Sequence, residues 1–257
     1  MAKEILKTHD LEFCSRPVLT GQQKLSYNGL DLVFSRYDAY WREMRKICVI
    51  HLFSSIRVQS FSPIREEEVS HMIEKISISA LDSELFNLTE AMMCLTSTII
   101  CRIAFGKSYE DGGDYFPYMG WVDSLTGLAR RLEKNFKEFD AFYQQIIDEH
   151  LDPNRSKPEH EDILDVLLQI YKDRPYKTQL TFDHIKAILM NIFVAGTDTS
   201  AATLSLANLL HKFDWEMPDG MRREDIDIDH VLPGITTHRR DPLCLVPKPY
   251  AVMGNSE

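Results

Sequence analysis

Apolar residues recur every three or four positions in the middle of the chain. The series consists of Leu132, Phe136, Phe139, Tyr143 and Ile147. This spacing places the five side chains on one face of an α-helix, opposite a polar face. The pattern therefore predicts an amphipathic helix that ends at about residue 150.

Further helices are predicted from apolar periodicity and from signals at helix ends. Asn87 and Glu90 form a capping-box-like pair, and Gly106 suits the far end of the helix that they begin. The longest pattern predicts one helix over about 181–213. The other predicted helices lie at 2–10, 39–52 and 163–171, with one more that begins near Pro63.

The end of the chain has a different character. Residues 214–257 contain five prolines and short apolar runs such as Pro242–Pro247, which is typical of turns and small strands. We therefore predict a mainly α fold with a small β part. We expect one domain over residues 1–257, built around the long helix at about 181–213.

Composition and charge narrow the classes of function. The chain has 257 residues, of which 44% are hydrophobic and 26% charged, as in ordinary globular proteins. The formal net charge is -10, because 39 Asp and Glu outnumber 29 Lys and Arg. Proteins that bind nucleic acid usually show the opposite balance, because they neutralise phosphates. We predict no nucleic-acid partner.

Cysteine and histidine spacing gives no sign of a disulfide framework or a zinc site. The five cysteines form no CxxC pair, and the nine histidines form no HExxH motif. We predict no metal site of this kind and a reducing compartment. The sequence also has no apolar N-terminal run and no apolar stretch of about 18 residues. We therefore expect no membrane anchor in this chain.

The segment Ala195–Ser200 interrupts the apolar pattern of the long helix. Its sequence, AGTDTS, consists mostly of poor helix formers, which together cost about 2–3 kcal/mol relative to alanine. Two explanations are open from the residues alone. The segment has a functional role at mid-helix, or Gly196 ends one helix and Ser200 caps the next.

Trp41 and Arg45 are a second candidate pair. Their spacing of four residues places both side chains on one face of the helix predicted at 39–52. Taken alone, the pair favours a packed tryptophan that is covered by a cation–π arginine.

Both motifs resemble those of cytochromes P-450 of the plant microsomal, specialised-metabolism type, in which the tryptophan and arginine also lie upstream of the AGTDTS-like segment. Ser15–Pro17, Asp162–Leu168 and Asp241–Val246 are similar to that group as well. The resemblance extends over nearly the whole chain. It implies a partial cytochrome P-450 fold around the central helix and heme b as cofactor. It also implies a monooxygenase that inserts one oxygen atom of O₂ into a lipophilic small molecule.

The resemblance implies a role for four residues of the long helix. Ala195 and Gly196 would lie against the heme, with the glycine leaving room for O₂. Asp198 and Thr199 would be catalytic residues that deliver protons, since splitting dioxygen requires two protons in a dry pocket.

The resemblance also implies roles for Trp41 and Arg45 and identifies partners. Both side chains would contact a heme propionate, for which a forked cation is well suited. Electrons would come from an NADPH-dependent reductase. The family is found on the cytosolic face of the endoplasmic reticulum membrane, whereas this chain, without an anchor, is expected to be soluble or peripheral.

The sequence departs from the family in two places. No cysteine lies in the Phe-x-x-Gly-x-Arg-x-Cys-x-Gly pattern that supplies the iron ligand, and no Glu-x-x-Arg pair occurs. The family's central helix passes directly into what resembles its final helix, which predicts an internal deletion with its junction near 203–207. Without the proximal thiolate we predict that the chain does not ligate heme iron and is inactive. The alternatives are a non-catalytic helical fragment that binds an apolar ligand or a partner protein, and the product of a pseudogene.

Overall fold

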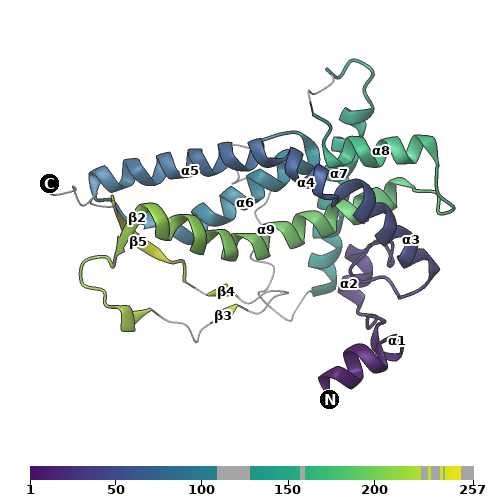
Figure 1. The fold of residues 1–257 in the computed structure, drawn as a ribbon, viewed down its shortest axis with the longest axis horizontal. Helices are drawn as coiled ribbons and strands as arrows, with labels where there is room; N and C mark the ends of the chain where they lie inside the picture. The colour runs from purple at the N-terminus through teal and green to yellow at the C-terminus, as the bar shows by residue number, and fades with distance from the viewer. Residues whose placement is uncertain (109–127, 157–159, 227–230, 233–237, 240, 250–257) are drawn as a thin grey trace. The chain divides into compact units, whose positions relative to one another are not determined.

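The computed structural model covers all 257 residues and describes the chain except for 109–127, 157–159, 227–230, 233–237, 240 and 250–257. In 128–131, 198–212, 223, 231–232, 238–239 and 249 only the backbone is described. Contacts divide the chain into two compact units that alternate along the sequence (Figure 1). Unit 1 comprises 1–61, 102–107 and 124–194, and unit 2 comprises 62–101, 108–123 and 195–257.

The regular elements in the described part of unit 1 are all helical. Two of its helices are long: α7 (Leu128–Leu151) and the part of α9 (Phe182–Lys212) that ends at Val194. The shorter helical elements are η1 (Glu4–Thr8), α1 (Asp10–Phe13), α2 (Thr20–Leu25), α3 (Ala39–Ile47), η2 (Cys48–Leu52), α4 (Ser55–Ser60) and α8 (Ile163–Asp173).

The core of unit 1 is built from the apolar faces that the sequence pattern predicts. Tyr143 and Ile147 of α7 are fully buried, as are Leu164 and Leu167 of α8 and Ile185 of α9. Asp162 caps α8 in a capping box with Asp165, which satisfies amide groups at the helix start. Burial of these faces holds the helices of unit 1 together.

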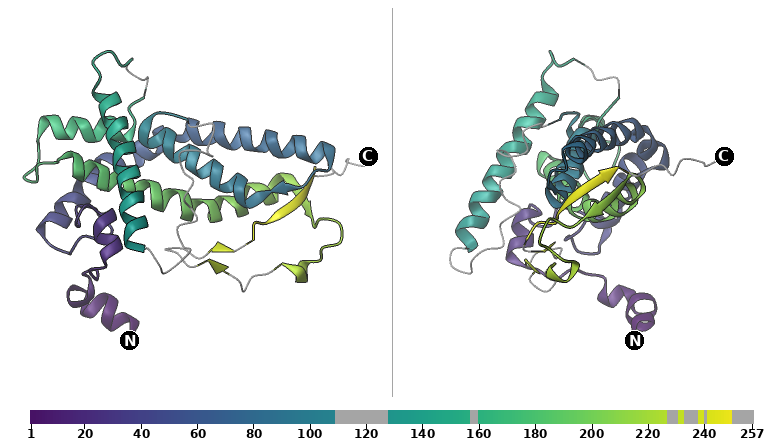
Figure 2. Two further views of the ribbon diagram at one scale, coloured as in Figure 1. Left: turned by 180° about the vertical axis from the view of Figure 1, so that it is seen from behind. Right: turned by 90° about the vertical axis from the view of Figure 1, so that its left-hand side faces the viewer.

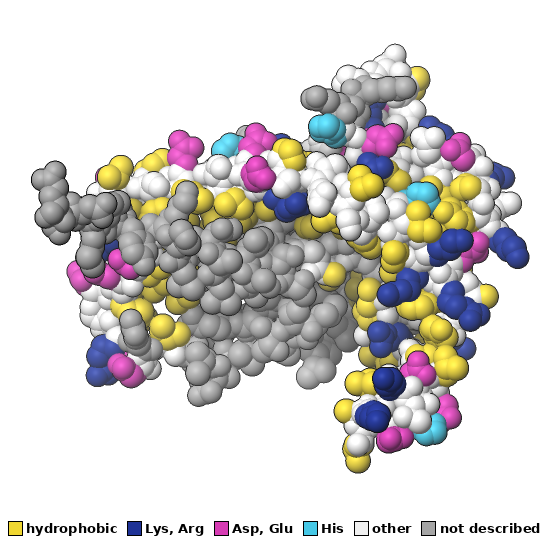
Figure 3. Space-filling view, viewed as in Figure 1, with side chains coloured by type: hydrophobic (Ala, Val, Ile, Leu, Met, Phe, Trp, Pro, Cys, Tyr) yellow, Lys and Arg dark blue, Asp and Glu magenta, His cyan; other side chains and the backbone are white. Residues whose placement is uncertain are grey.

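The N-terminal helices of unit 1 carry apolar side chains at the surface. Leu6, Leu11 and Phe13 are 77%, 68% and 59% exposed. Figure 3 shows apolar side chains beside basic ones in this part of the chain.

Unit 2 combines helices with two small sheets. Its helices are α5 (Ser62–Asp82), most of α6 (Leu88–Phe105), the rest of α9 and the short turn η3 (Arg223–Asp225). Strand β5 (Cys244–Pro249) lies between β1 (Phe86–Asn87) and β2 (Phe213–Glu216) and is antiparallel to both (Figure 2). The strands β3 (Val231–Leu232) and β4 (His238–Arg239) form a separate antiparallel pair.

Helix α6 shows how end signals set the bounds of a helix. The Asn87 side chain accepts a hydrogen bond from the Glu90 amide (3.1 Å) and donates one to the Glu90 carboxylate (3.0 Å). At the other end Gly106 has a φ of 65°, which glycine adopts without strain. A Cβ atom there would lie 2.7 Å from Asp162 Oδ2. The capping pair and the terminal glycine are therefore both confirmed.

Helix α6 also corrects one expectation from the sequence. We predicted no segment that could span a membrane, but α6 is long and apolar enough to do so by length and composition. The prediction counted uninterrupted apolar residues, whereas Glu90 and Arg102 lie near the two ends of α6 and leave its middle apolar. Met92, Leu95 and Ile99 of α6 are buried within the fold, and core helices of globular proteins meet the same criterion.

The mainly α fold with a small β part is confirmed, and the long helix predicted at 181–213 is α9. The segment Ala195–Ser200 continues α9 without a break, so the alternative of two helices that meet at Gly196 is wrong. A single domain over 1–257, with a deletion junction near 203–207, stays a prediction.

Candidate functional site

Helix α3 begins at a capped turn that fixes Trp41. Asp38 is extended, and its side chain accepts a hydrogen bond from the Trp41 amide at 2.9 Å. Such a cap supplies a partner for an amide of the first turn, typically stabilising the helix by about 1 kcal/mol. Trp41 and Arg45 therefore start from a defined backbone.

The predicted pair Trp41 and Arg45 is brought together. The Arg45 guanidinium lies over the Trp41 ring, 5.4 Å from its centroid. The Tyr37 ring is tilted against the Trp41 ring, and their centroids lie 5.1 Å apart. The Arg42 guanidinium lies over the Tyr37 ring, 5.8 Å from its centroid. Arg45 has no carboxylate partner among the residues that the structure describes. The cluster thus presents an exposed cation on a stacked aromatic ring.

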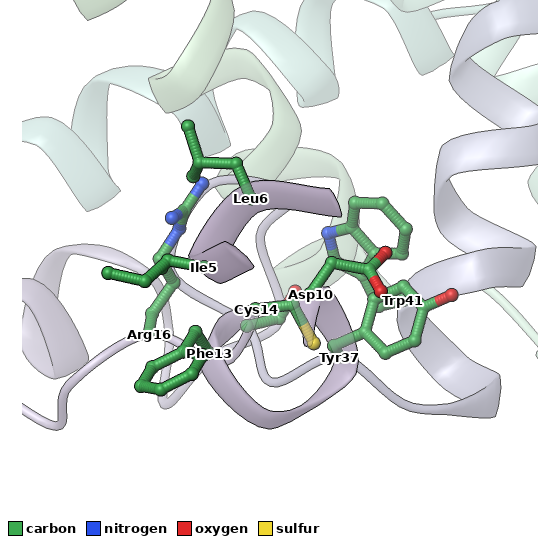
Figure 4. A pocket seen from close by; sticks show the side chains of 9 residues that line it. Ile5, Leu6, Asp10, Phe13, Cys14, Arg16, Tyr37 and Trp41 are labelled. Atoms are coloured by element: carbon green, nitrogen blue, oxygen red, sulfur yellow. The ribbon is translucent and has the colours of Figure 1, made fainter. Parts of the chain in front are cut away.

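A pocket of about 330 Å³ lies beside this cluster (Figure 4). Arg16, Ser35 and Trp41 contribute polar groups to it. The hydroxyl of Ser35 is buried and has no hydrogen-bond partner. The remaining lining residues are Ile5, Leu6, Asp10, Phe13, Cys14 and Tyr37. This mixture of apolar walls and a few polar groups is typical of sites for small molecules.

The segment 30–35 contributes Ser35 to the pocket and is held from several sides. Tyr40 Oη donates to the Leu30 carbonyl (2.7 Å), Trp41 Nε1 to the Leu32 carbonyl (2.9 Å), and Arg16 Nε to the Val33 carbonyl (3.2 Å). The Trp41 indole donor is therefore already occupied, which leaves Arg45 as the group of the pair that is available to an anion.

Two residues that the sequence reasoning missed fix the same segment, namely Asn191 of α9 and Asp31 of the segment itself. Asn191 Oδ1 accepts hydrogen bonds from the amides of Leu32 (3.0 Å) and Val33 (3.2 Å), and Asn191 Nδ2 donates to Asp31 Oδ2 (2.9 Å). Asp31 is fully buried. Burial raises the pKa of Asp31, and hydrogen bonds from Asn191 and Phe34 oppose the shift. One signal was available: Asn191 is a polar residue in the apolar run Ile188–Val194.

The opposite face of α3 is anchored by Glu43. Its carboxylate accepts hydrogen bonds from the amides of Lys177 (3.0 Å) and Thr178 (2.9 Å) and from the Thr178 hydroxyl. The Thr178 hydroxyl is the main cause of a lowered pKa at Glu43. Next to it, His51 Nε2 lies 2.6 Å from Tyr176 Oη. Helix α3 is therefore held through its Glu43 face, and Trp41 lies on the opposite face.

The other predicted residues belong to unit 2, where Gly196 allows a close helix contact. A Cβ atom at Gly196 would lie 2.5 Å from Ile100 Cδ1 and 2.9 Å from Ile100 Cγ1 of α6. Ala195 precedes it and is exposed. The next residue, Thr197, is 3% exposed, and its hydroxyl has no hydrogen-bond partner among the residues whose side chains are described. The side chains of Asp198 and Thr199 lie outside the described residues.

Three of the five cysteines have a thiol pKa that is raised by burial. Burial raises the pKa of Cys48 and that of Cys101 to about 12, so both are neutral thiols at pH 7. Burial also raises the pKa of Cys94, with a contribution from Glu90. Cys14 lines the pocket, with its thiol 3.3 Å from the Leu11 carbonyl, and Cys244 lies in β5.

A buried group of possible metal ligands is already neutralised by an arginine. Ligand atoms of His150, Asp162 and Asp165 lie within 4.8 Å of one another. Arg155 Nη2 lies 3.1 Å from Asp162 and Arg155 Nη1 lies 2.5 Å from Asp165. The guanidinium thus supplies the positive charge that a metal would bring. We therefore assign the cluster to the packing of unit 1.

Comparison with known proteins gives matches over most of the chain. The family model described as Cytochrome P450 matches residues 1–126 and 113–207. The 5-OH-xanthotoxin synthase of Pastinaca sativa is 45% identical over 228 residues, which cover 79% of this chain and 44% of that protein. Cytochrome P450 71A1 of Persea americana is 40% identical over 253 residues, covering 88% and 49%. The chain thus spans about half the length of the curated relatives that it matches.

A solved structure shares the fold. A zebra fish cytochrome P450 with progesterone superposes with a TM-score of 0.65 at 22% sequence identity, covering 79% of this chain and 50% of that one. The predicted partial cytochrome P-450 fold is therefore confirmed.

Proposed function

We propose, because the chain belongs to the cytochrome P450 family, that it is part of a heme-dependent monooxygenase that acts on a lipophilic small molecule. The observation that carries the proposal is Arg45, an exposed cation stacked on Trp41 without a carboxylate partner in the described structure. Such a group fits a propionate. When bound in this family, heme supplies the iron centre for oxygen chemistry.

The cysteines of this chain fit the role of ligand to the heme iron less well than Arg45 fits a propionate. None of the five cysteines lies in the family's ligand pattern, and burial keeps Cys48 and Cys101 as thiols, with the pKa of each raised. We propose that the polypeptide of these 257 residues binds heme through the Arg45 side only and does not turn over. Ala195, Gly196, Asp198 and Thr199 are proposed as its oxygen-side residues.

A hemin titration tests this proposal. The visible absorbance of hemin should change saturably on addition of the protein, and Arg45→Gln should weaken binding about tenfold. Arg42→Gln is the matched control, because Arg42 is also exposed and stacked on an aromatic ring. Equal binding by both variants would remove Arg45 from the site. A thiolate-type Soret band after reduction and CO treatment would contradict the proposed inactivity.

The proposed deletion is tested at the level of the transcript. The second family-model match ends at residue 207, which supports a junction near 203–207. Sequencing the message across the codons for Ala201 to Leu210 should show an intervening stretch with Glu-x-x-Arg and the cysteine loop. A message that reads straight through would mean that the short polypeptide is a real product.

For such a product, the pocket favours a second function. Its wall contains the apolar side chains of Ile5, Leu6 and Phe13, which suits a non-catalytic protein that binds an apolar ligand. Saturable binding of a lipophilic dye, unaffected by Arg45→Gln, would favour this alternative over heme binding.

Membership of the family also supports a proposal for the redox partner and the cellular location of the whole enzyme. We propose an NADPH-dependent reductase as electron donor for the whole enzyme, at the cytosolic face of the endoplasmic reticulum. Co-fractionation of the tagged whole protein with microsomes would test the location.

A further inference from the structure

The contact between α9 and the segment 31–34 is polar and partly buried. The Asn191 amide oxygen accepts hydrogen bonds from the amides of Leu32 (3.0 Å) and Val33 (3.2 Å). Because two backbone donors point at this oxygen, the orientation of the Asn191 side chain is determined. Its nitrogen therefore faces Asp31 Oδ2, 2.9 Å away. Asp31 in turn accepts a hydrogen bond from the Phe34 amide at 3.0 Å.

Neither Asn191 nor Asp31 lines the pocket, but both act on residues that do. The two residues whose amides Asn191 binds also hold pocket side chains through their carbonyls. Leu32 accepts from Trp41 Nε1 (2.9 Å), and Val33 accepts from Arg16 Nε (3.2 Å). The Leu32 carbonyl and the Val33 amide share one rigid peptide unit, as do the Val33 carbonyl and the Phe34 amide. A shift of the amides that Asn191 and Asp31 bind would therefore move the carbonyls that hold Trp41 and Arg16.

We infer that Asn191 and Asp31 are a positioning pair that sets the orientation of Trp41 and, through its ring, of Arg45. The inference rests on the proposed function only where it assigns Arg45 to a propionate. Asn191 holds Leu32, Leu32 holds the Trp41 indole, and the indole carries the Arg45 guanidinium at 5.4 Å. A carboxylate ligand at Arg45 would thus depend on a residue that it does not touch.

The pair offers a sharp test, because its donor and acceptor can be exchanged. In Asn191→Asp two carboxylates face each other and the hydrogen bond to Asp31 is lost. In the double variant Asp31→Asn/Asn191→Asp the hydrogen bonds of Asn191 can form again, because the amide introduced at position 31 can donate to the carboxylate introduced at position 191. The Phe34 amide keeps its hydrogen bond to Oδ1 of residue 31 and loses only the longer one to Oδ2. One negative charge is kept, as in the original chain. Rescue by the exchange would separate a specific pair from a general need for polar residues.

Hydrogen exchange measured by NMR on the full chain is the first readout. In Asn191→Asp we expect the Leu32 and Val33 amides and the Trp41 indole proton to exchange at least tenfold faster, relative to the amides of α8. The exchanged double variant should return to within about threefold of the original protein. Met190→Leu is the control, since it alters the neighbouring buried position of α9 and should leave the ratio unchanged.

Hemin affinity is the second readout. We expect Asn191→Asp to weaken hemin binding about as much as Arg45→Gln, and the double variant to restore it. If the original chain does not bind hemin, the proposed function fails in this respect, while the exchange ratios still decide the positioning role. Unchanged ratios in Asn191→Asp overturn the inference. If Asn191→Asp does not fold, the double variant decides: normal exchange supports the pair, and failure to fold overturns it.

Discussion

Two neighbouring turns of α9 each contain a polar side chain, Asn191 and Thr197, and the two side chains differ in their hydrogen bonding. In unit 1, Asn191 makes three hydrogen bonds, to Leu32, Val33 and Asp31. In unit 2, the Thr197 hydroxyl is buried and makes none. An unpaired buried polar group costs about 1–3 kcal/mol, so a fold retains it only where something other than stability requires it.

The comparison distinguishes two roles of polar side chains within one helix, one in structure and one in function. Asn191 has all its hydrogen bonds within unit 1, so its role is to fix a neighbouring segment. Thr197 belongs to AGTDTS, the segment that the family resemblance assigns to oxygen chemistry, and its hydroxyl is available to a group that the described structure does not contain. The following predictions test this contrast from the largest expected effect to the smallest.

Asn191→Leu should cost the most stability. The substitution leaves the Leu32 and Val33 amides without their acceptor and removes one hydrogen bond from the buried Asp31 carboxylate, so we expect the free energy of unfolding to fall by about 3 kcal/mol or more. Urea unfolding followed by circular dichroism measures the change. Met190→Leu, a change of similar size beside it, should cost less than about 1.5 kcal/mol. A loss below about 1 kcal/mol for Asn191→Leu would mean that the hydrogen bonds are not important.

Gly196→Ala should destabilise the protein by up to about 2 kcal/mol, as the balance of two opposing effects. Alanine is the better helix former by about 1 kcal/mol, but its Cβ would lie 2.5 Å from Ile100 Cδ1, and overpacking costs about 1–3 kcal/mol. In an Ile100→Ala background the same substitution should become stabilising. A double-mutant cycle measures this coupling, and additive effects would show that Gly196 is not needed for the α6 contact.

Thr197→Val should stabilise the protein by about 1 kcal/mol, since it replaces a buried hydroxyl without a partner by a methyl group of similar shape. Thr96→Val is the matched control. Thr96 is equally buried in α6, but its hydroxyl donates to the Met92 carbonyl at 3.0 Å. We expect the control to lose up to about 1 kcal/mol. Thermal unfolding measures both changes in stability. If both substitutions stabilise or both destabilise the protein, the two hydroxyls do not differ as we infer.

Asp31 should make a small contribution to the pH dependence of stability. Burial raises its pKa above the ordinary value of 3.8, so the folded state binds the proton more tightly than the unfolded state. The contribution of Asp31 is therefore most favourable below pH 3.8 and is lost as the pH rises through the folded pKa. Unfolding free energies between about pH 3 and 7 should fall more steeply in the original protein than in Asp31→Asn. Parallel curves would argue against a raised pKa.

Most of the fold could be predicted from the sequence, because it follows from local signals. The apolar spacing at Leu132–Ile147 predicted α7, and the Asn87 and Gly106 signals predicted the ends of α6. Trp41 and Arg45 were found because four-residue spacing is a local property of a helix. Local signals did not decide whether α9 is interrupted at AGTDTS, since intrinsic preferences are weak beside the packing of a long helix.

The rest of the site depends on contacts between distant segments. Asn191 and Asp31 are separated by 160 positions, and no local rule links an asparagine in an apolar helix to an aspartate in a loop. The anchor of Glu43 on Thr178 is equally distant, with 135 positions between them. A single sequence marks such residues only as polar exceptions in apolar surroundings and does not identify their partners.

The order of strands in the small sheet has a consequence for the newly synthesised chain. Strand β5 lies between β1 and β2, so Asn87 finds its partner Cys244 only after a long stretch of further synthesis. At about 5–20 residues per second this delay on the ribosome is roughly 10–30 s. During this time the backbone groups of β1 that later bind β5 are unpaired and open to other strands. We therefore expect chaperones that act during translation to bind β1 until β5 has been synthesised.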